Sequence, residues 1–515
     1  MTEVLIAGAG PTGLMLACEL RTAGVDVLVL DRLPGRGGES RAGGLHARTL
    51  EVLDQRGMLA PFLAAGREVA ATHFSALWLD ISGFQTRYPY TLMLVQTEVE
   101  RLLAERLAAL GGRVRWSAEV VGVRQDADGV DVELGGGERI RARYLVGCDG
   151  GRSTVRKVAG IDFPGTPATL TALLADVRLT DPPTGLVFQE RREHGDYSVL
   201  RFGPDWYRVM TTQHDRVADR DAPVTFEDVR AAMLRIAGTD HGMHSPSWVS
   251  RFGDAARQAS RYREGRILLA GDAAHIHYPA GGQGLNTGVQ DAVNLGWKLA
   301  AAVRGHSPAG GRDLEAADGR DHHLLARWAD DLLDSYGAER HPVAERVLDN
   351  TRAQTALARP GPHTDALRAT FRDLIGMAEV NRSLTGMITA LDLRYDLGEG
   401  HPLVGRRVPD VDLKSAGGDL RLFELLHAAR PVFLDLGGAP GCAEVAGEWA
   451  VTVVEARSAE DAWGIPVIGE VPVPGAVLIR PDGHVAWAGG SVPELRAALG
   501  RWCAPLVETR SGGAA

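Results

Sequence analysis

The sequence EVLIAGAGPTGLMLACELRTAGVDVLVLD, residues 3–31, decides the fold. Its apolar run at 3–7 predicts a buried strand, and residues 14–22 have the spacing of a helix. A second apolar run, at 25–30, predicts another strand. A strand, a helix and a strand within about 30 residues form a βαβ unit, and such units build parallel sheets.

Three glycines, Gly8, Gly10 and Gly13, separate the first strand from the helix in the pattern GxGxxG. In such a pattern the first glycine permits a tight turn, the second lets a pyrophosphate approach, and the third lets the helix pack near the strand. The helix N-terminus offers amide donors to phosphate. Asp31, after the second strand, can accept hydrogen bonds from a ribose. The pattern predicts a dinucleotide site without specifying the dinucleotide, and an ordinary glycine turn is the alternative.

Two more polar clusters follow apolar strands. The first, CDGGRSTVR at 148–156, is equally explained as a polar turn that caps a helix. In the second, GDAAH at 271–275, Asp272 follows the strand ILLA and lies at the carboxyl end, where open α/β sheets bind ligands. The glycine-rich stretch GGQGLN at 281–286 then opens a long helix, whose dipole favours negative charge developing on a bound ring.

Composition limits the classes of protein to which the chain can belong. Its 515 residues suggest two to four domains. The 56 basic and 66 acidic residues give a net charge of −10, which argues against nucleic-acid binding. The four cysteines form no CxxC motif, and no apolar run reaches the roughly 18 residues that span a bilayer. We therefore expect a cytoplasmic protein without a disulfide framework, and no membrane or nucleic-acid partner.

The pattern of elements changes along the chain. Strand-like segments with one helix at 226–236 dominate residues 169–252 and predict a mostly antiparallel sheet. Helical spacing extends over 323–359, and glycine and proline near 402–409 suggest a linker. The remaining residues contain the hairpin sequence VLIRPDGHVAW and read as a small α/β unit.

Taken in order, five motifs resemble a known family. They are VLIAGAGPTGLMLACEL (4–20), SRAGGLHARTLEVL (40–53), LVGCDGGRSTVRK (145–157), ILLAGDAAHIHYPAGGQGLNTGVQDAVNLGWKLA (267–300) and ERHPVAERVL (339–348). Together they resemble the class A FAD-dependent aromatic hydroxylases, the para-hydroxybenzoate hydroxylase group. The sequence is most similar to members that hydroxylate aromatic polyketides and carry a thioredoxin-like C-terminal domain.

The resemblance implies an α/β fold with three domains. A Rossmann-like FAD-binding domain with its following helices would comprise residues 1–168 and 253–400. A mostly antiparallel substrate-binding β-sheet domain would be inserted at 169–252, and a thioredoxin-like α/β domain would cover 401–515.

The same resemblance implies FAD as cofactor and NADPH or NADH as co-substrate. Carried over position by position, the FAD contacts would be Gly8, Gly10, Pro11, Gly13, Asp31, Arg32, Arg41, Gln96, Asp149, Asp272, Pro279, Gly282, Gly284, Leu285 and Asn286. Asp149 opens the stretch up to Arg156 that would serve FAD and NAD(P)H together.

The family's chemistry needs no side-chain nucleophile, so no catalytic residue is assigned. Reduced flavin and O₂ would form a C4a-hydroperoxide, which an electron-rich phenolic ring attacks. The pocket would lie between the FAD domain and the antiparallel sheet. Candidate lining residues, for each of which core packing is the commoner explanation, are Phe188, Tyr197, Phe202, Trp206 and Tyr207.

Other interpretations of these motifs lead to different activities. The same scaffold could insert oxygen beside a ketone in a Baeyer–Villiger reaction, or hold FAD as a non-catalytic module. Asp272 with His275 and His277 lacks the HExxH context of a metal site, so we expect no metal. No cysteine is separated from Cys442 by two residues, as in a CxxC pair, which argues against a redox role for the C-terminal unit. A monomer and a homodimer both remain open.

Overall fold

The structure is a computed structural model that describes residues 2–38, 40–219, 222–305 and 319–504. Its first unit is built on a sheet whose central strands are all parallel, as the βαβ pattern predicts. The order of these strands is β20 (Ile267–Leu269), β11 (Arg139–Gly147), β1 (Thr2–Ala7), β2 (Val27–Leu30) and β8 (Arg113–Arg115).

Helix α1 (Pro11–Thr22) lies at the centre of this unit. Residues 13–20 of the helix are all buried, because α1 packs on the sheet, on α4 (Gln96–Ala109) and on α7 (Gln283–Gly305). The helix expected at 14–22 is confirmed and starts earlier, at Pro11, and the long helix expected at the glycine-rich stretch 281–286 is confirmed as α7. A helix buried on all sides has little freedom to shift, so the turn before α1 is rigidly placed.

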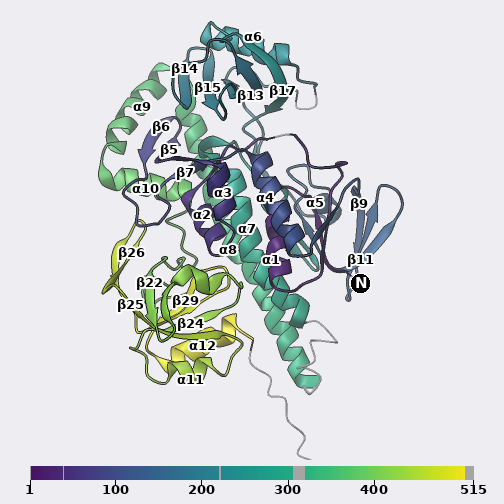
Figure 1. Cartoon of the computed structure of the whole chain (residues 1–515). Coiled ribbons are helices and arrows are strands. Elements are labelled where there is room, and N and C mark those ends of the chain that lie inside the picture. The colour runs from purple at the N-terminus through teal and green to yellow at the C-terminus, as the bar shows by residue number, and fades with distance from the viewer. Residues whose placement is uncertain (1, 39, 220–221, 306–318, 505–515) are drawn as a thin grey trace, which may run out of the picture.

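The antiparallel sheet is also confirmed, and α6 (Phe226–Ala237) covers one face of it at the top of Figure 1. Thr225 and Asp228 form a capping box that begins this helix. The strand order is β14 (Val187–Arg192), β15 (Gly195–Arg201), β16 (Tyr207–Gln213), β13 (Thr171–Leu179) and β17 (Met243–Phe252).

The helical stretch after the parallel sheet is one long helix, α8 (Gly319–Ala358), with Pro342 inside it. Two further helices, α9 (Pro362–Ile375) and α10 (Ala378–Thr389), pack on the hairpin of β5 (Ala71–Phe74) and β6 (Leu77–Asp80) through a small apolar cluster. Among the helices of the described residues, none combines the length and apolarity needed to cross a bilayer.

The C-terminal unit contains a mixed sheet flanked by α11 (Cys442–Ala446) and α12 (Val492–Trp502). One pair of its strands is parallel, and the expected PDG hairpin joins its last two strands. The strand order is β23 (Gly418–Arg421), β22 (Asp412–Ser415), β25 (Thr452–Ser458), β24 (Val432–Asp435), β28 (Ala476–Ile479) and β29 (Val485–Gly489).

The remaining elements are short and lie at the edges of these units. They are β3 (Gly44–Leu45), α2 (Ala47–Asp54), α3 (Ala60–Ala65), β4 (Arg67–Val69), β7 (Thr91–Met93), β9 (Val120–Gln125), β10 (Val130–Leu134), α5 (Thr154–Val158), β12 (Gly165–Thr166), β18 (Ala256–Gln258), β19 (Arg263–Glu264), β21 (His275–Ile276), β26 (Ala462–Ile465), β27 (Gly469–Pro472), and the 3₁₀ turns η1 (Gly271–Ala273), η2 (Ala280–Gly282) and η3 (Leu422–Leu426).

Two sequence-based expectations are corrected. The alternating runs at 114–124 and 129–134 predict one hairpin, but the first residues of the first run lie in β8, which pairs with β2, and only β9 pairs with β10. The stretch at 402–409 is not a loose linker, because Leu403 is fully buried and Arg407 is 4% exposed. The positions of the domain boundaries stay predictions.

The buried His46 and the half-buried His73 make the stability depend on pH. Burial lowers the pKa of His46 and of His73 to about 4, from the ordinary value of 6.5. Between these values the unfolded chain binds a proton on each imidazole that the folded protein does not bind. The stability contributed by the neutral imidazoles is therefore fully present above pH 6.5 and is lost as the pH falls toward 4.

We predict that the free energy of unfolding, measured by urea denaturation, decreases between pH 6.5 and 4.5. Each histidine adds up to about 1.4 kcal/mol per pH unit to that slope. The variant His73→Gln should show a shallower slope, whereas His363→Gln, at an exposed position, should match the original protein. Equal slopes for His73→Gln and the original protein would contradict the assignment of a neutral, half-buried His73.

Candidate functional site

The turn between β1 and α1 uses its three glycines in two different ways. A Cβ on Gly8, whose φ is +105°, would lie 2.3 Å from the carbonyl oxygen of Cys148, and a Cβ on Gly13 would lie 2.0 Å from the carbonyl oxygen of Gly8. A Cβ on Gly10, by contrast, would meet no atom within 4 Å. Gly8 and Gly13 thus serve close backbone packing, while Gly10 faces open space.

The N-terminus of α1 is available to a ligand. The helix begins at Pro11, and its N-cap residue, Gly10, supplies no side-chain hydrogen bond to the first amides. Such amides, together with the helix dipole, attract a phosphate group. The glycine turn therefore fits the pyrophosphate that the sequence pattern predicts.

The carboxylate of Asp31 is tied to this turn. Its Oδ2 accepts a hydrogen bond of 2.7 Å from the backbone amide of Ala9, and its Oδ1 accepts one of 2.9 Å from Leu33. The acid at the end of β2 thus lies beside the glycines, as expected, and it also holds the turn in shape. The neighbouring Arg32 is exposed.

Asp272 reaches the same place from a distant part of the chain. It lies on η1, directly after β20, and is exposed. A Cβ on the preceding Gly271 would lie 2.6 Å from Oγ1 of Thr12, and one on Gly288 of α7 would lie 2.3 Å from the same atom. The turn that carries Asp272 therefore packs directly on the start of α1, because both glycines lack a side chain.

The segment at 148–156, which contains Asp149-Gly150 and is called the DG segment below, has a structural role that the sequence left open. Asp149 accepts hydrogen bonds from the amides of Thr154 and Val155 and from the hydroxyl of Ser153, at 2.7, 3.2 and 2.5 Å. Its carboxylate therefore caps α5. Arg156 then joins this segment to η1 by donating to the carbonyl oxygens of Ala273 and Gly151.

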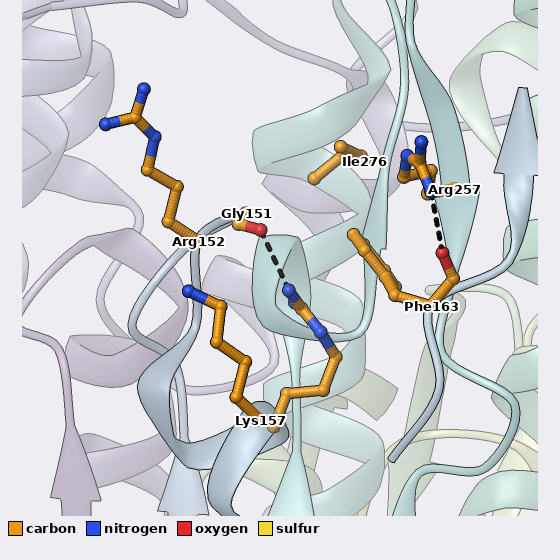
Figure 2. Close-up of a pocket in the computed structure, with 7 residues that line it drawn as sticks. Gly151, Arg152, Lys157, Phe163, Arg257 and Ile276 are labelled. Atoms are coloured by element: carbon orange, nitrogen blue, oxygen red, sulfur yellow. Dashed lines mark hydrogen bonds between the residues drawn. The ribbon is translucent and has the colours of Figure 1, made fainter. Parts of the chain in front are cut away.

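A basic cavity of about 480 Å³ lies between α5 and β18 (Figure 2). The Arg156 guanidinium lies 3.7 Å from the centre of the Phe163 ring, and Arg257 donates to the carbonyl oxygen of Phe163. Four cations in one cavity favour a ligand with more than one negative charge. The lining residues are Gly151, Arg152, Arg156, Lys157, Phe163, Arg257 and Ile276.

The glycine-rich loop before α7 adopts backbone that favours glycine, with φ of +71° at Gly281 and +67° at Gly282. Gly282 and Pro279 are exposed, and Gly284 and Leu285 are half-buried, so these residues can meet a ligand. Backbone without side chains lets a flat ring approach closely.

Two residues expected to touch a cofactor instead use their side-chain amides within the protein. Asn286 is 2% exposed; it accepts hydrogen bonds from the His46 amide and the Thr49 hydroxyl, and donates to the Gly282 carbonyl oxygen. Gln96 accepts from the amide of Ala42 and donates to Glu100. Both side chains fix loops beside the site, and Arg41, next to Ala42, is exposed.

The five candidate substrate contacts do not share one environment. Phe188, Tyr197 and Tyr207 belong to the apolar cluster between the sheet and α6 or pack against it, which is the core packing weighed above. Trp206 is half-buried in the turn between β15 and β16. Phe202 contacts the loop at 41–43, because a Cβ on Gly43 would be 2.9 Å from its ring.

The opposite face of the sheet points toward the parallel-sheet unit. Strand pairing places Leu174 beside Met210 on that face, one residue out of phase with the cluster under α6. Thr212 on the same face shares a 2.7 Å hydrogen bond with the hydroxyl of Tyr278, which follows η1, and Tyr278 packs on Phe252. Leu174, Met210 and Thr212 were not among the sequence-based candidates, although strand alternation places them on the face opposite Tyr207.

No group of three or more His, Cys, Asp or Glu side chains is placed to hold a metal ion within the described part of the chain. His275 donates to or accepts from Asp291 Oδ2 at 2.7 Å, and Arg340 donates to Oδ1. Beside Arg340 and His275, the pKa of the Asp291 carboxyl is lowered despite its burial. The histidine that follows the GD turn is therefore held by a hydrogen bond within the protein.

Comparison with known proteins agrees with this geometry. A family profile described as "FAD binding domain" matches residues 1–351, and one described as "Aromatic-ring hydroxylase, C-terminal" matches residues 401–505. The chain is 45% identical, over 98% of its length and 99% of the relative's, to a 12-dehydrotetracycline 5-monooxygenase/anhydrotetracycline 6-monooxygenase of Streptomyces rimosus.

The solved structure of OxyS anhydrotetracycline hydroxylase from Streptomyces rimosus matches with a TM-score of 0.86 at 44% identity, covering 98% of this chain and 99% of that one. A relative with a different kind of activity is the dialkyldecalin synthase of Streptomyces rugosporus, which is 41% identical over 98% of this chain and 99% of its own.

Proposed function

The chain belongs to the family of FAD-dependent aromatic-ring hydroxylases and is an FAD-dependent monooxygenase; we propose that its substrate is a polycyclic phenol of the aromatic polyketide type. The observation that carries this proposal is the likeness over the whole chain to an enzyme named for tetracycline oxidation, together with an open glycine turn and an exposed Asp272 beside it.

FAD fits the residues that the structure brings together. We propose that the α1 amides with Gly8, Gly10, Pro11 and Gly13 hold its pyrophosphate, and that Asp272 holds the ribityl chain or the pyrophosphate. Asp31 and Arg32 are proposed to meet the adenosine end, and Arg41 the phosphates, with Gln96 and Asp149 acting through the loops that they fix. Pro279, Gly282, Gly284 and Leu285 are proposed to line the ring, on a loop that Asn286 holds.

When bound, FAD supplies the electron transfer and the activation of oxygen. The chain's own residues bind, orient and exclude water. Positive φ at Gly281 and Gly282 lets backbone approach the ring, and the N-terminus of α7 favours negative charge there. Met210, half-buried on the sheet face opposite α6, is proposed to offer apolar contact to a flat substrate, with the buried Leu174 packed beside it.

We further propose that the basic cavity binds the phosphates of NADPH or NADH. Its cations can pair with a pyrophosphate, and Arg156 connects its wall to the GD turn through the carbonyl oxygen of Ala273. The cavity thus lies next to the residues assigned to FAD, which is where a reductant must bind to reach the flavin.

The named synthase among the relatives favours a second candidate function, in which the protein holds FAD but catalyses a reaction without oxygen transfer. Such an activity would require no reductant. Insertion of oxygen beside a ketone is the third possibility, since it adds one oxygen atom just as hydroxylation does.

Incubation of the purified protein with NADPH and a panel of anthraquinone- and angucycline-type phenols tests the proposed function. We expect at least one phenol to accelerate NADPH oxidation and to gain one oxygen atom, as measured by mass spectrometry. NMR of the product distinguishes a new hydroxyl group from ring insertion. Conversion of a substrate without NADPH and without added oxygen would instead support the second candidate.

Gly10→Val is predicted to fold but to bind little FAD, because its side chain would enter open space where the pyrophosphate is placed. Gly13→Val, whose Cβ would collide with the Gly8 carbonyl oxygen, should lose the fold itself. Asp272→Ala should also lower the flavin content. The measurements are flavin absorbance per protein and thermal melting; full flavin content in both Gly10→Val and Asp272→Ala would overturn the site assignment.

Arg257→Ala is predicted to raise the KM for NADPH roughly tenfold or more, because removal of a charged hydrogen-bonding partner costs about 1.5–3 kcal/mol. Flavin content and reduction by dithionite should not change. Arg261→Ala, at an exposed position nearby, is the matched control. An unaltered KM in Arg257→Ala would remove NAD(P)H from this cavity.

A further inference from the structure

The turn of the β28–β29 hairpin is inserted between the C-terminal unit and the FAD-binding unit. Arg480, Asp482 and His484 in this turn are at most 2% exposed, although all three are polar. Arg56, at the end of α2, donates to the carbonyl oxygen of Pro481 at 2.7 Å. Arg407 contacts both Gln55 and the carbonyl oxygen of Asp482.

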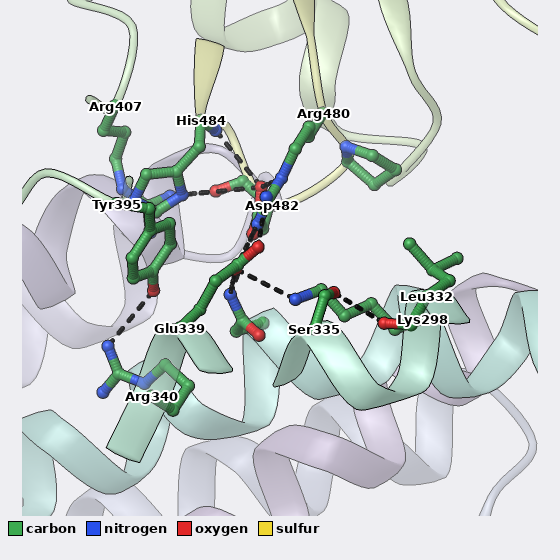
Figure 3. A network of polar contacts seen from close by, with 12 residues as sticks. Lys298, Leu332, Ser335, Glu339, Arg340, Tyr395, Arg407, Arg480, Asp482 and His484 are labelled. Carbon is green, nitrogen blue, oxygen red and sulfur yellow. Dashed lines mark hydrogen bonds and ion pairs between the residues drawn. The ribbon is translucent and has the colours of Figure 1, made fainter. Parts of the chain in front are cut away.

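Arg480 joins the turn to α8 through a two-pronged ion pair (Figure 3). Its Nη1 and Nη2 donate to Oε1 and Oε2 of Glu339 at 2.7 and 2.8 Å, while Nε and Nη2 donate to Asp482. On the same carboxylate, Lys298 and Asn294 of α7 donate to Oε2 at 2.9 and 2.6 Å. The guanidinium is thus fixed in both position and orientation.

The next residue of α8, Arg340, carries the network toward the FAD site. It is fully buried and donates from Nε to Asp291 Oδ1 at 2.6 Å and from Nη1 to the hydroxyl of Tyr395 at 3.2 Å. The ring of Tyr395 lies 4.3 Å from that of His484 and 5.6 Å from the Arg480 guanidinium. The hairpin turn is therefore connected with Arg340 in two ways. Arg480 pairs with Glu339, the residue before Arg340 on α8, and His484 packs on Tyr395, which accepts a hydrogen bond from Arg340.

Asp291 completes the connection. Its Oδ2 accepts a hydrogen bond of 3.1 Å from the amide of Gly271, the residue before Asp272. The β28–β29 hairpin turn is also connected to α1. Arg56, which donates to the carbonyl oxygen of Pro481 in that turn, also donates to Glu19 of α1 at 2.7 and 2.9 Å. The hairpin turn is thus linked by buried polar contacts to both the GD turn and α1.

We propose that this hairpin turn positions the FAD site, and that Arg480 is its positioning residue. The inference rests on the proposed contact of Asp272 with FAD. A carboxylate held in place before binding loses less conformational freedom when the ligand arrives, so its positioning increases affinity. Burial of charged groups costs desolvation energy, and an apolar contact would join the two units without that cost.

The test measures the dissociation constant of FAD from the full-length apoprotein by quenching of flavin fluorescence. Arg480→Gln is expected to raise it roughly tenfold, within the range of coupling between connected groups. Arg480→Lys keeps the charge but loses the fork, so it should fold and show a smaller increase. Arg496→Gln, which removes an exposed ion pair with Glu448 in the same unit, should leave the constant unchanged.

A double-mutant cycle separates positioning from general stability. If Arg480 acts through Asp272, Arg480→Gln should weaken FAD binding in the original protein but add little in Asp272→Ala. Additive effects of the two substitutions, or an unchanged dissociation constant in both Arg480 variants, would overturn the proposal. If Asp272→Ala itself leaves FAD binding unchanged, the assignment of Asp272 fails, and this inference fails with it.

Discussion

The close approach of α1 to the turns around it is the constraint on which the whole site depends. Thr12 occupies the space that Gly271 and Gly288 leave open, and Gly13 lies against the backbone of Gly8. A single methyl group at any of these glycines would separate elements that must touch. Because interiors are close-packed, such a separation would propagate to the turn that carries Asp272. These glycines thus assemble the site, whereas Gly10 faces open space beside the first turn of α1.

Buried charge supplies what close packing alone does not: orientation. Asp291 receives Gly271, His275 and Arg340 on its two oxygens, so the GD turn has a fixed angle as well as a fixed distance. Removal of one partner from such a pair leaves an uncompensated buried charge, which is far more costly than the pair is stabilising. The arrangement is therefore sensitive to distant substitutions, and it couples α7 and α8 to the GD turn.

The sequence predicts what is encoded locally and fails where distant contacts decide. The GxGxxG turn, α1 and β2 lie within one short stretch, so spacing alone indicates them. Asp149 could not be assigned from spacing, because a DG segment that binds a ligand and one that caps a helix have the same residues. Alternation places Tyr197 and Tyr207 on one face of their sheet, but only the position of α6 shows which face is the core. Asn286 accepts a hydrogen bond from the amide of His46, which is far away in the sequence, so no local pattern could indicate this contact.

The C-terminal unit contacts the first unit through buried charged groups. Within it, Cys442 is buried, burial raises the pKa of its thiol, and no cysteine stands three positions away, at the spacing of a CxxC pair. Arginine side chains make many of the polar contacts between the two units. Of the 56 basic residues only Lys157, Lys298 and Lys414 are lysines, and burial lowers the pKa of Lys298 to about 8. Arginine stays charged when buried and grips both carboxylate oxygens. A chain rich in arginine can thus place ion pairs inside a domain interface, where lysines would tend to lose their charge.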